Sequence, residues 1–275
     1  MKPLQDARPP ASLPSGGLPL NLAQWCLALV RPPRSRTPPV SAGAIAAIVI
    51  TLAAIVAAMF LLDVPAVAWA HHLPRGMVDV FEVITNAGLS GWYLVPSGIV
   101  VVLLAALASP ASPRATWGVL TALAARFGFF FLAVGVPGLM TNVLKHLIGR
   151  ARPYIEQAGH PFTFAPLNWS SNYASLPSGH ATTAASVAFA IGAIWPRTRP
   201  FMWLYVLIIM FSRIVLMSHH PSDVIAGALV GTVFAALVRR WFAARRLVFS
   251  PRTLAAYPGP SLGRIRTAIK SVLSS

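Results

Sequence analysis

The chain has 275 residues, of which 56% are hydrophobic and 10% are charged. This composition is too apolar for a water-soluble domain and indicates an integral membrane protein with several helical spans. The net charge is +16, but the basic residues gather in the tails and at the ends of apolar segments, as topology signals do, which argues against nucleic acid as a partner. The single Cys26 excludes an internal disulfide and a multi-cysteine metal site.

The amino-terminal residues 1–40 are rich in Pro and Ser with scattered Arg, a composition typical of disorder. Within them, residues 18–30 are apolar but too few to span a bilayer, which favours an interfacial helix. We therefore predict three parts: a disordered or interfacial tail over 1–40, a membrane domain over 41–240 and a basic tail over 241–275.

Six apolar segments of the middle part have the length of about 17–22 residues that a bilayer requires. They lie near 42–62, 92–109, 123–144, 179–195, 201–217 and 222–238. Residues 76–88 are mixed polar and apolar, which is typical of an amphipathic helix lying on the membrane surface. The predicted fold class is all-α: a polytopic membrane protein with six transmembrane helices.

The basic residues predict how these spans are oriented. With six spans, both tails and the charges near residues 114, 126 and 197–199 fall on one side of the membrane. The positive-inside tendency then puts both termini in the cytoplasm. The polar blocks described next fall on the opposite, non-cytoplasmic face, at the ends of spans three to six.

The first block carries Lys145 and Arg152 at the end of the third span. Both can flank one anion, since Arg offers a planar fork to two phosphate oxygens and Lys a point charge. The alternative is that they are ordinary interfacial anchors. Arg150 fits better as such an anchor or as a lipid-headgroup contact.

The second block, Pro177-Ser178-Gly179-His180, immediately precedes the fourth span. Ser178 near the cap and the exposed amides of a helix start favour anion binding, and Gly179 lets the backbone approach the anion closely. His180 can donate a proton, because the reference pKa of histidine, about 6.5, is near working pH. The alternative is a simple capped helix.

The third block places His219 and Asp223 four residues apart, on one face at the start of the last span. A carboxylate bonded to one ring nitrogen fixes the tautomer and leaves the other nitrogen as a nucleophile. The alternative is a charged helix cap. His220 is a weaker candidate for the same role and is better explained as a cap. Arg213, near the end of the fifth span, would be a third phosphate ligand.

These blocks resemble the three signature motifs of the type-2 phosphatidic acid phosphatase superfamily, at every motif position and in the same order. The matching residues are Lys145-x6-Arg152-Pro153, Pro177-Ser178-Gly179-His180 and Ser212-Arg213-x5-His219-x3-Asp223. The superfamily includes bacterial lipid phosphatases, glucose-6-phosphatase and vanadium haloperoxidases, and the resemblance covers roughly residues 42–240. It implies that His219 attacks phosphorus to form a phosphohistidine, with Asp223 orienting it. It implies that His180 protonates the leaving alkoxide and then activates water. It also implies that no metal or other cofactor is needed and that the phosphate is held by Lys145, Arg152, Ser178, Gly179 and Arg213.

The loop 153–176 contains aromatic residues and is predicted to form a lid or a rim for lipid above the site, or an ordinary aromatic belt. These residues are Tyr154, Phe162, Phe164, Trp169 and Tyr173.

Together, these features predict a membrane phosphatase that hydrolyses a lipid-linked phosphate or pyrophosphate at the non-cytoplasmic face. The resemblance implies that this membrane is the bacterial inner membrane and that the face is periplasmic. Two alternatives stay open: a lipid phosphotransferase that uses the same site, and a transporter or scramblase that does no chemistry. Activity is expected to fall between pH 8 and pH 5 as His219 protonates. The particular lipid, the oligomeric state and the role of the tails do not follow from the sequence.

Overall fold

The structure is a computed structural model of the chain, and it describes residues 27, 30–107, 113–155 and 161–273. The tail and the interfacial helix predicted within residues 1–40 lie largely outside the described residues. Across the described residues, secondary structure consists of helices, short 3-10 turns and two isolated β-bridges. The all-α class predicted from the sequence is therefore confirmed.

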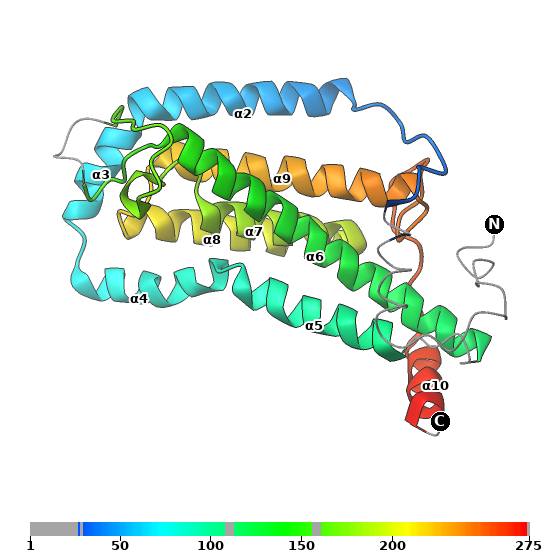
Figure 1. Cartoon of the computed structure of the whole chain (residues 1–275). Coiled ribbons are helices and arrows are strands. Elements are labelled where there is room, and N and C mark those ends of the chain that lie inside the picture. The colour runs from blue at the N-terminus through cyan, green and yellow to red at the C-terminus, as the bar shows by residue number, and fades with distance from the viewer. Residues whose placement is uncertain (1–26, 28–29, 108–112, 156–160, 274–275) are drawn as a thin grey trace. The chain divides into compact units, whose positions relative to one another are not determined.

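A described helix covers most of each predicted apolar segment, and the helices are labelled as in Figure 1. In chain order they are α2 (Ala42–Leu61), α3 (Asp63–His71), α4 (Arg75–Thr85), α5 (Gly91–Leu107), α6 (Arg114–Ile148), α7 (Gly179–Ile194), α8 (Arg199–Val215), α9 (Pro221–Ala244) and α10 (Leu262–Leu273). The 3-10 turns are η1 (Asn86–Gly88), η2 (Ser171–Tyr173) and η3 (Pro196–Thr198).

Among the described residues, 5 helical segments are long and apolar enough to cross a membrane: Ala42–Leu61, Arg75–Leu107, Arg114–Ile148, Pro196–Val215 and Pro221–Ala244. The second of these segments comprises α4, η1 and α5, and the fourth comprises η3 and α8. The membrane character is thus confirmed. The count of six spans stays a prediction, because the segment expected to be the fourth span is α7, an apolar helix of 16 residues. The amphipathic segment 76–88 is indeed helical, as α4 and η1.

The third predicted span begins earlier than the sequence indicates. Helix α6 starts at Arg114 instead of near residue 123, so Arg126 lies well inside it. The Arg126 guanidinium donates to the carbonyl of Ala122 at 2.9 Å and to the carbonyls of Tyr257 and Pro258 at 2.8 and 3.0 Å. Carbonyl groups of the carboxyl tail therefore satisfy a cation that looks from the sequence like the start of a span.

The chain divides into two compact units. The first, which we call the site unit, comprises Pro39–Tyr93 and Ala133–Ala236; the second, the tail unit, comprises Met1–Pro38, Leu94–Leu132 and Leu237–Ser275. All the motif residues belong to the site unit. In the tail unit, Phe129 packs edge-on against Phe242 and Phe249, with ring centroids 5.5 and 4.6 Å away.

Helix α7 is the central helix of the site unit and is buried along most of its length. It packs against α8, which in turn contacts α3 and α4 (Figure 1). On the α9 side, a Cβ at Gly227 or Gly231 would lie 2.4 Å from the carbonyl oxygen of Ser178 or Thr182. Glycines four residues apart thus allow the backbones of α7 and α9 to touch, as in many membrane helix pairs.

Candidate active site

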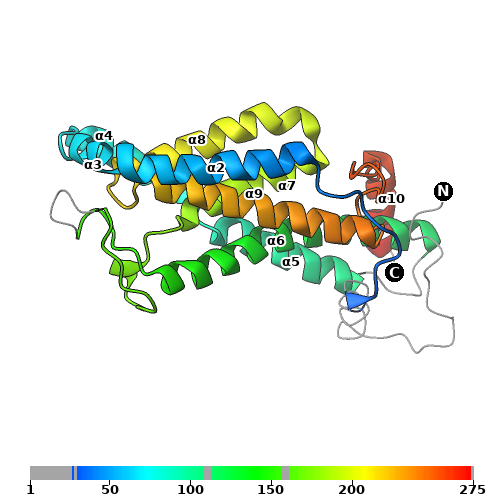
Figure 2. The same ribbon diagram turned by 90° about the horizontal axis from the view of Figure 1, so that it is seen from above.

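The first motif block begins where α6 ends. Gly149 terminates the helix with a φ of 63°, and a Cβ there would lie 1.8 Å from the carbonyl oxygen of Ala165. The conformation and the space therefore both require glycine. Beyond this turn the chain passes through Arg150 and Arg152 and, as Figure 2 shows from above, the green loop returns to the start of α7.

The second block forms the start of α7, with Ser178 at the N-cap. The Ser178 amide donates to the carbonyl of Asp223 at 3.0 Å, which fixes the start of α7 to the start of α9. A Cβ at Gly179 would meet nothing within 4 Å beyond its chain neighbours and its own helix, so the space on the Cβ side of this residue is open in the described structure. His180 follows in the first turn and packs against Gly88, where a Cβ would lie 3.0 Å from the imidazole.

The third block spans the connection from α8 to α9. The amides of Ser218 and His219 both donate to the carbonyl of Arg213, at 3.1 and 3.3 Å, so the chain turns back tightly after α8. The Arg213 guanidinium donates to Thr85 Oγ1 of α4 at 2.9 Å. Thr85 also accepts from Ser212 at 3.1 Å and was not a candidate in the sequence.

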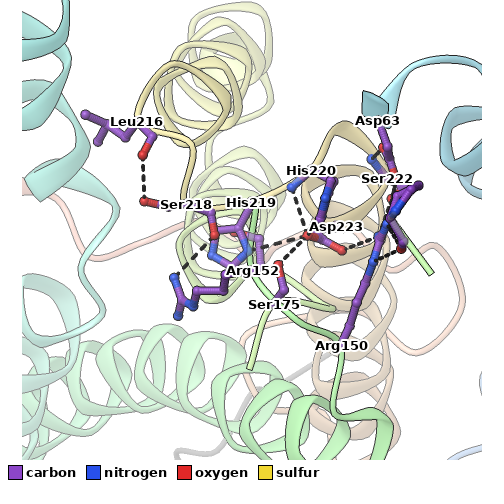
Figure 3. Close-up of polar contacts among 12 residues, drawn as sticks. Asp63, Arg150, Arg152, Ser175, Leu216, Ser218, His219, His220, Ser222 and Asp223 are labelled. Atoms are coloured by element: carbon purple, nitrogen blue, oxygen red, sulfur yellow. Dashed lines mark hydrogen bonds and ion pairs between the residues drawn. The ribbon is translucent and has the colours of Figure 1, made fainter. Parts of the chain in front are cut away.

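The three blocks meet within the site unit: the Ser178 amide bonds to Asp223, and Figure 3 shows Arg152 of the first block beside the third. The Arg152 guanidinium donates to the carbonyl of Ser218 at 3.3 Å, which joins the first block to the third. The charges of Lys145, Arg152 and Arg213 all act on His180. The structure thus brings together the predicted site residues Lys145, Arg152, Ser178, Gly179, His180, Arg213, His219 and Asp223.

The Asp223 carboxylate is the centre of a dense set of hydrogen bonds (Figure 3). Its Oδ2 accepts from Ser175 Oγ at 2.6 Å and from the His220 amide at 2.9 Å, and lies 3.2 Å from His220 Nδ1. Its Oδ1 accepts from the Arg150 guanidinium at 2.7 Å. His219 Nδ1 is farther away, 3.8 Å from Oδ2, a distance at which attraction is electrostatic and no hydrogen bond forms.

Arg150 is not the surface anchor or headgroup contact that the sequence favours; that interpretation is wrong. Its side chain is completely buried and makes two ion pairs, with Asp223 at 2.7 Å and with Asp63 at 2.8 Å. Burial alone would lower the pKa of Arg150, but the two carboxylates outweigh burial and raise it. The guanidinium therefore stays charged.

Asp63, the first residue of α3, is the member of this network that sequence reasoning missed. It accepts from the Ser222 amide at 3.0 Å and from Ser222 Oγ at 2.6 Å, in addition to Arg150. It lies 87 residues before Arg150, and no motif spacing connects the two. One signal was present: it is one of only 6 acidic residues, at the end of an apolar segment on the predicted face of the site.

His219 is buried, with 3% of its surface exposed. Burial lowers its pKa to about 4, and the charges of Arg152 and Arg213 act in the same direction while Asp223 opposes them. The imidazole is therefore neutral near pH 7. A neutral imidazole keeps a lone pair on one ring nitrogen, which a nucleophile requires.

Three site residues carry a buried polar atom that has no hydrogen-bond partner in the described part of the chain: Ser178 Oγ, Arg213 Nε and His219 Nδ1. A buried donor without a partner costs about 1–3 kcal/mol. An anion with several acceptor oxygens would remove this cost for Ser178 and Arg213. The arrangement is therefore suited to bind a phosphate-like anion beside a neutral histidine.

The loop between α6 and α7 carries an exposed Trp169. The indole stacks on His146, with ring centroids 4.7 Å apart, and is 77% exposed. Two residues further along, the carbonyl of Ser171 accepts from Arg152 Nε at 3.0 Å. The exposed ring fits the predicted rim or aromatic belt, and its role stays a prediction.

The apolar helices and this site define a membrane protein with a buried polar site that carries histidines and cations. The profile of the PAP2 superfamily matches residues 126–247, which include all three motif blocks. Lipid A 1-phosphatase of Rhizobium johnstonii is 32% identical over 207 residues, which cover 74% of this chain and 83% of the relative. The chain therefore belongs to the PAP2 superfamily, as its motifs predict.

Two further relatives and one solved structure are also similar to this chain. Lipid A 1-phosphatase of Rhizobium etli is 30% identical over 207 residues, 74% of this chain and 87% of the relative. Decaprenylphosphoryl-5-phosphoribose phosphatase of Mycobacterium tuberculosis is 29% identical over 188 residues, 62% of this chain and 92% of the relative. A crystal structure of a transmembrane PAP2 type phosphatidylglycerolphosphate phosphatase from Bacillus subtilis matches 70% of this chain and 94% of its own, with 23% identity and a TM-score of 0.48.

Proposed function

We propose that this protein is a membrane phosphatase that hydrolyses a lipid-linked phosphate or pyrophosphate. The observation that carries the proposal is the meeting of a buried neutral histidine, His219, with two buried side chains that have unpaired polar atoms, Ser178 and Arg213. The similarity to lipid phosphatases of Rhizobium and Mycobacterium supports the same activity.

In the first step, the lone pair of His219 Nε2 forms a bond to phosphorus, and the bond from phosphorus to the lipid oxygen breaks. His180 gives its proton to that oxygen, so the lipid leaves as an alcohol. Asp223, 3.8 Å from the Nδ1 side of His219, stabilises the positive charge that the ring gains. The product is a phosphohistidine.

In the second step, His180 takes a proton from water while the water oxygen bonds to phosphorus. The nitrogen–phosphorus bond then breaks, which releases phosphate and restores neutral His219. The negative charge on the phosphate oxygens is neutralised by Lys145, Arg152 and Arg213, and by hydrogen bonds from Ser178 and the Gly179 amide. This scheme uses no metal or other cofactor.

The location of the site supports a lipid substrate. It lies at the ends of apolar helices, where a headgroup reaches it while the acyl or prenyl chains stay in the bilayer. The first substrate to test is lipid A, because two relatives are named lipid A 1-phosphatases. We further propose six spans in the bacterial inner membrane, both termini in the cytoplasm and the site facing the periplasm, on the strength of the charge distribution.

The activity is tested with purified protein and a panel of lipid A, undecaprenyl pyrophosphate, phosphatidylglycerol phosphate and phosphatidic acid, with a chelator present. Phosphate release is expected from at least one lipid, and His219→Ala should reduce it by about four orders of magnitude or more, since uncatalysed hydrolysis is very slow. Labelled phosphate that appears on an acceptor lipid instead of in solution would favour the phosphotransferase. Lipid movement that survives His219→Ala, with no phosphate released by the wild type, would favour the transporter.

The orientation is tested separately with a membrane-impermeant thiol reagent on intact cells, using single cysteines at Leu167 in the loop after α6 and at Ser261 in the carboxyl tail, in a Cys26→Ser background. Labelling of the loop cysteine alone is expected. Labelling of the tail cysteine alone would reverse the proposed orientation.

A further inference from the structure

Three charged side chains are buried together behind the site, one from each of three distant segments. Asp63 begins α3, Arg150 follows α6, and Asp223 lies in the first turn of α9, and each has 0% of its surface exposed. Their formal charges sum to −1. The cluster is fully desolvated, so its charges act on their surroundings with little screening.

Arg150 divides its guanidinium between the two carboxylates. One terminal nitrogen donates to Asp223 at 2.7 Å and the other to Asp63 at 2.8 Å. Asp63 is held in turn by the amide and hydroxyl of Ser222, the residue directly before Asp223. Among the described residues, the donors to both Asp63 oxygens therefore belong to Arg150 or to Ser222, which adjoins Asp223.

We propose that Asp63 is a positioning residue for catalysis: it takes half of the charge of Arg150, so that Asp223 keeps the negative charge that acts on His219. The inference rests on the proposed function, because it concerns the step in which His219 attacks phosphorus. Asp63 cannot reach the substrate itself, since Arg150 and Ser222 surround it and its side chain has no exposed surface.

The physical reason lies in the balance of charges around His219. As the nitrogen–phosphorus bond forms, the ring becomes positively charged. Arg152 and Arg213 disfavour that charge, and Asp223 favours it. Without Asp63, Arg150 would pair with Asp223 alone and the cluster would be neutral. Asp223 would then stabilise the positive charge on His219 less well against the repulsion from Arg152 and Arg213.

The test uses the full-length protein in lipid nanodiscs and the lipid phosphate that the wild type hydrolyses fastest. We expect Asp63→Asn to lower kcat about tenfold, the change that corresponds to about 1.4 kcal/mol. The KM and the inhibition constant for inorganic phosphate should change by less than about twofold, because the phosphate ligands are untouched. A kcat equal to that of the wild type would overturn the proposal.

A double-mutant cycle separates positioning from general damage. Because Asp63 acts through Asp223, Asp63→Asn should have almost no further effect on kcat in an Asp223→Asn background. If the two substitutions lower kcat independently, or if phosphate inhibition weakens in parallel with kcat, Asp63 is only a structural residue.

A milder variant covers the case in which Asp63→Asn does not fold. Ser222→Ala keeps all three charges but removes the hydroxyl that links Arg150 to Asp63. It should lower kcat about threefold without changing phosphate inhibition, and an unchanged kcat would overturn the proposal. Wild-type protein that releases no phosphate from any lipid would instead overturn the proposed function itself.

Discussion

Two buried arginines of the site unit have opposite surroundings. All three guanidinium nitrogens of Arg150 have partners: Pro161, Ser222, Asp223 and Asp63. Arg213 is 8% exposed, donates to Thr85 and leaves its Nε without a partner in the described structure. Fully satisfied buried groups stabilise a fold, whereas unsatisfied ones store a cost that a ligand can remove. We infer that Arg150 supports the site and that Arg213 binds the phosphate.

The largest expected effect is on folding, from Arg150→Gln. This change leaves two buried carboxylates without their cation, and removing one partner of a buried ion pair typically costs about 3–5 kcal/mol. Chemical denaturation of the detergent-solubilised protein would measure the loss. Arg152→Gln is the control, because Arg152 is half-buried and bonds only to backbone carbonyls, so stability should change by less than about 1 kcal/mol. Equal stability of the two variants would contradict the supporting role of Arg150.

The next effect is on catalysis, from Arg213→Gln. Removing a preorganised donor to the transition state typically lowers the rate about 10²–10³-fold, so kcat/KM should fall in this range. The stability of the variant should equal or exceed that of the wild type, because a buried, half-satisfied charge is removed. Phosphate-release assays and denaturation of the same preparation would measure both quantities.

Inorganic phosphate provides an independent readout for the same variant. A ligand that binds only the folded state raises the unfolding temperature. Phosphate should therefore stabilise the wild type more than Arg213→Gln. Loss of stability and activity in parallel, as expected for Arg150→Gln, would show that the two arginines do not differ.

A smaller effect is expected where α9 holds the start of α7 in place. In Gly227→Ala, the added Cβ would lie 2.4 Å from the carbonyl oxygen of Ser178, so α7 must shift. Overpacking of this kind costs about 1–3 kcal/mol, and displacement of Ser178 should lower kcat about tenfold or more. Gly138→Ala on α6 is the control, since a Cβ there meets nothing within 4 Å. Identical behaviour of the two alanine variants would contradict the proposed helix contact.

The helices could be predicted from the sequence because a bilayer sets both their length and their composition. The predicted spans agree with the observed helices to within a few residues, except at the start of α6 and at the end of α9, where the helix continues to Ala244 instead of ending near residue 238. At the start of α6 the cause is a tertiary contact. The carbonyls of Tyr257 and Pro258, more than 130 residues away, accept hydrogen bonds from Arg126, and such a contact cannot be predicted from the sequence. The division into two units was not foreseen.

The motif residues of the site could be predicted because polar groups at the ends of apolar segments are conspicuous in this chain. The residues that hold these motif residues in place could not be predicted. Asp63 and Thr85 bond to partners 87 and 128 residues away, and no periodicity connects such positions. His220 shows a further limit: its Nδ1 is nearer to Asp223 than that of His219, a detail of the first turn of α9 that spacing alone does not fix.

The smallest expected effect is that of lowering the pH from 8 to 5, which should leave activity almost unaltered. Neutral His219 is the reactive form, so activity falls as pH drops through its pKa. With the reference value of about 6.5, the neutral fraction would fall about thirtyfold between pH 8 and pH 5. Burial lowers the pKa to about 4, so activity should fall only slightly over this interval, with the main loss below pH 5. This revises the fall between pH 8 and pH 5 that the sequence led us to expect.

The measurement is kcat/KM of the wild type from pH 8 to pH 3.5, on a substrate whose own phosphate titration is corrected for. Asp223→Asn is the informative variant: Asp223 is the group that raises the pKa of His219, so its removal should move the acid limb to still lower pH. An acid limb near pH 6.5 would mean that water reaches His219 in the working enzyme, and the buried, desolvated nucleophile described for this site would be wrong.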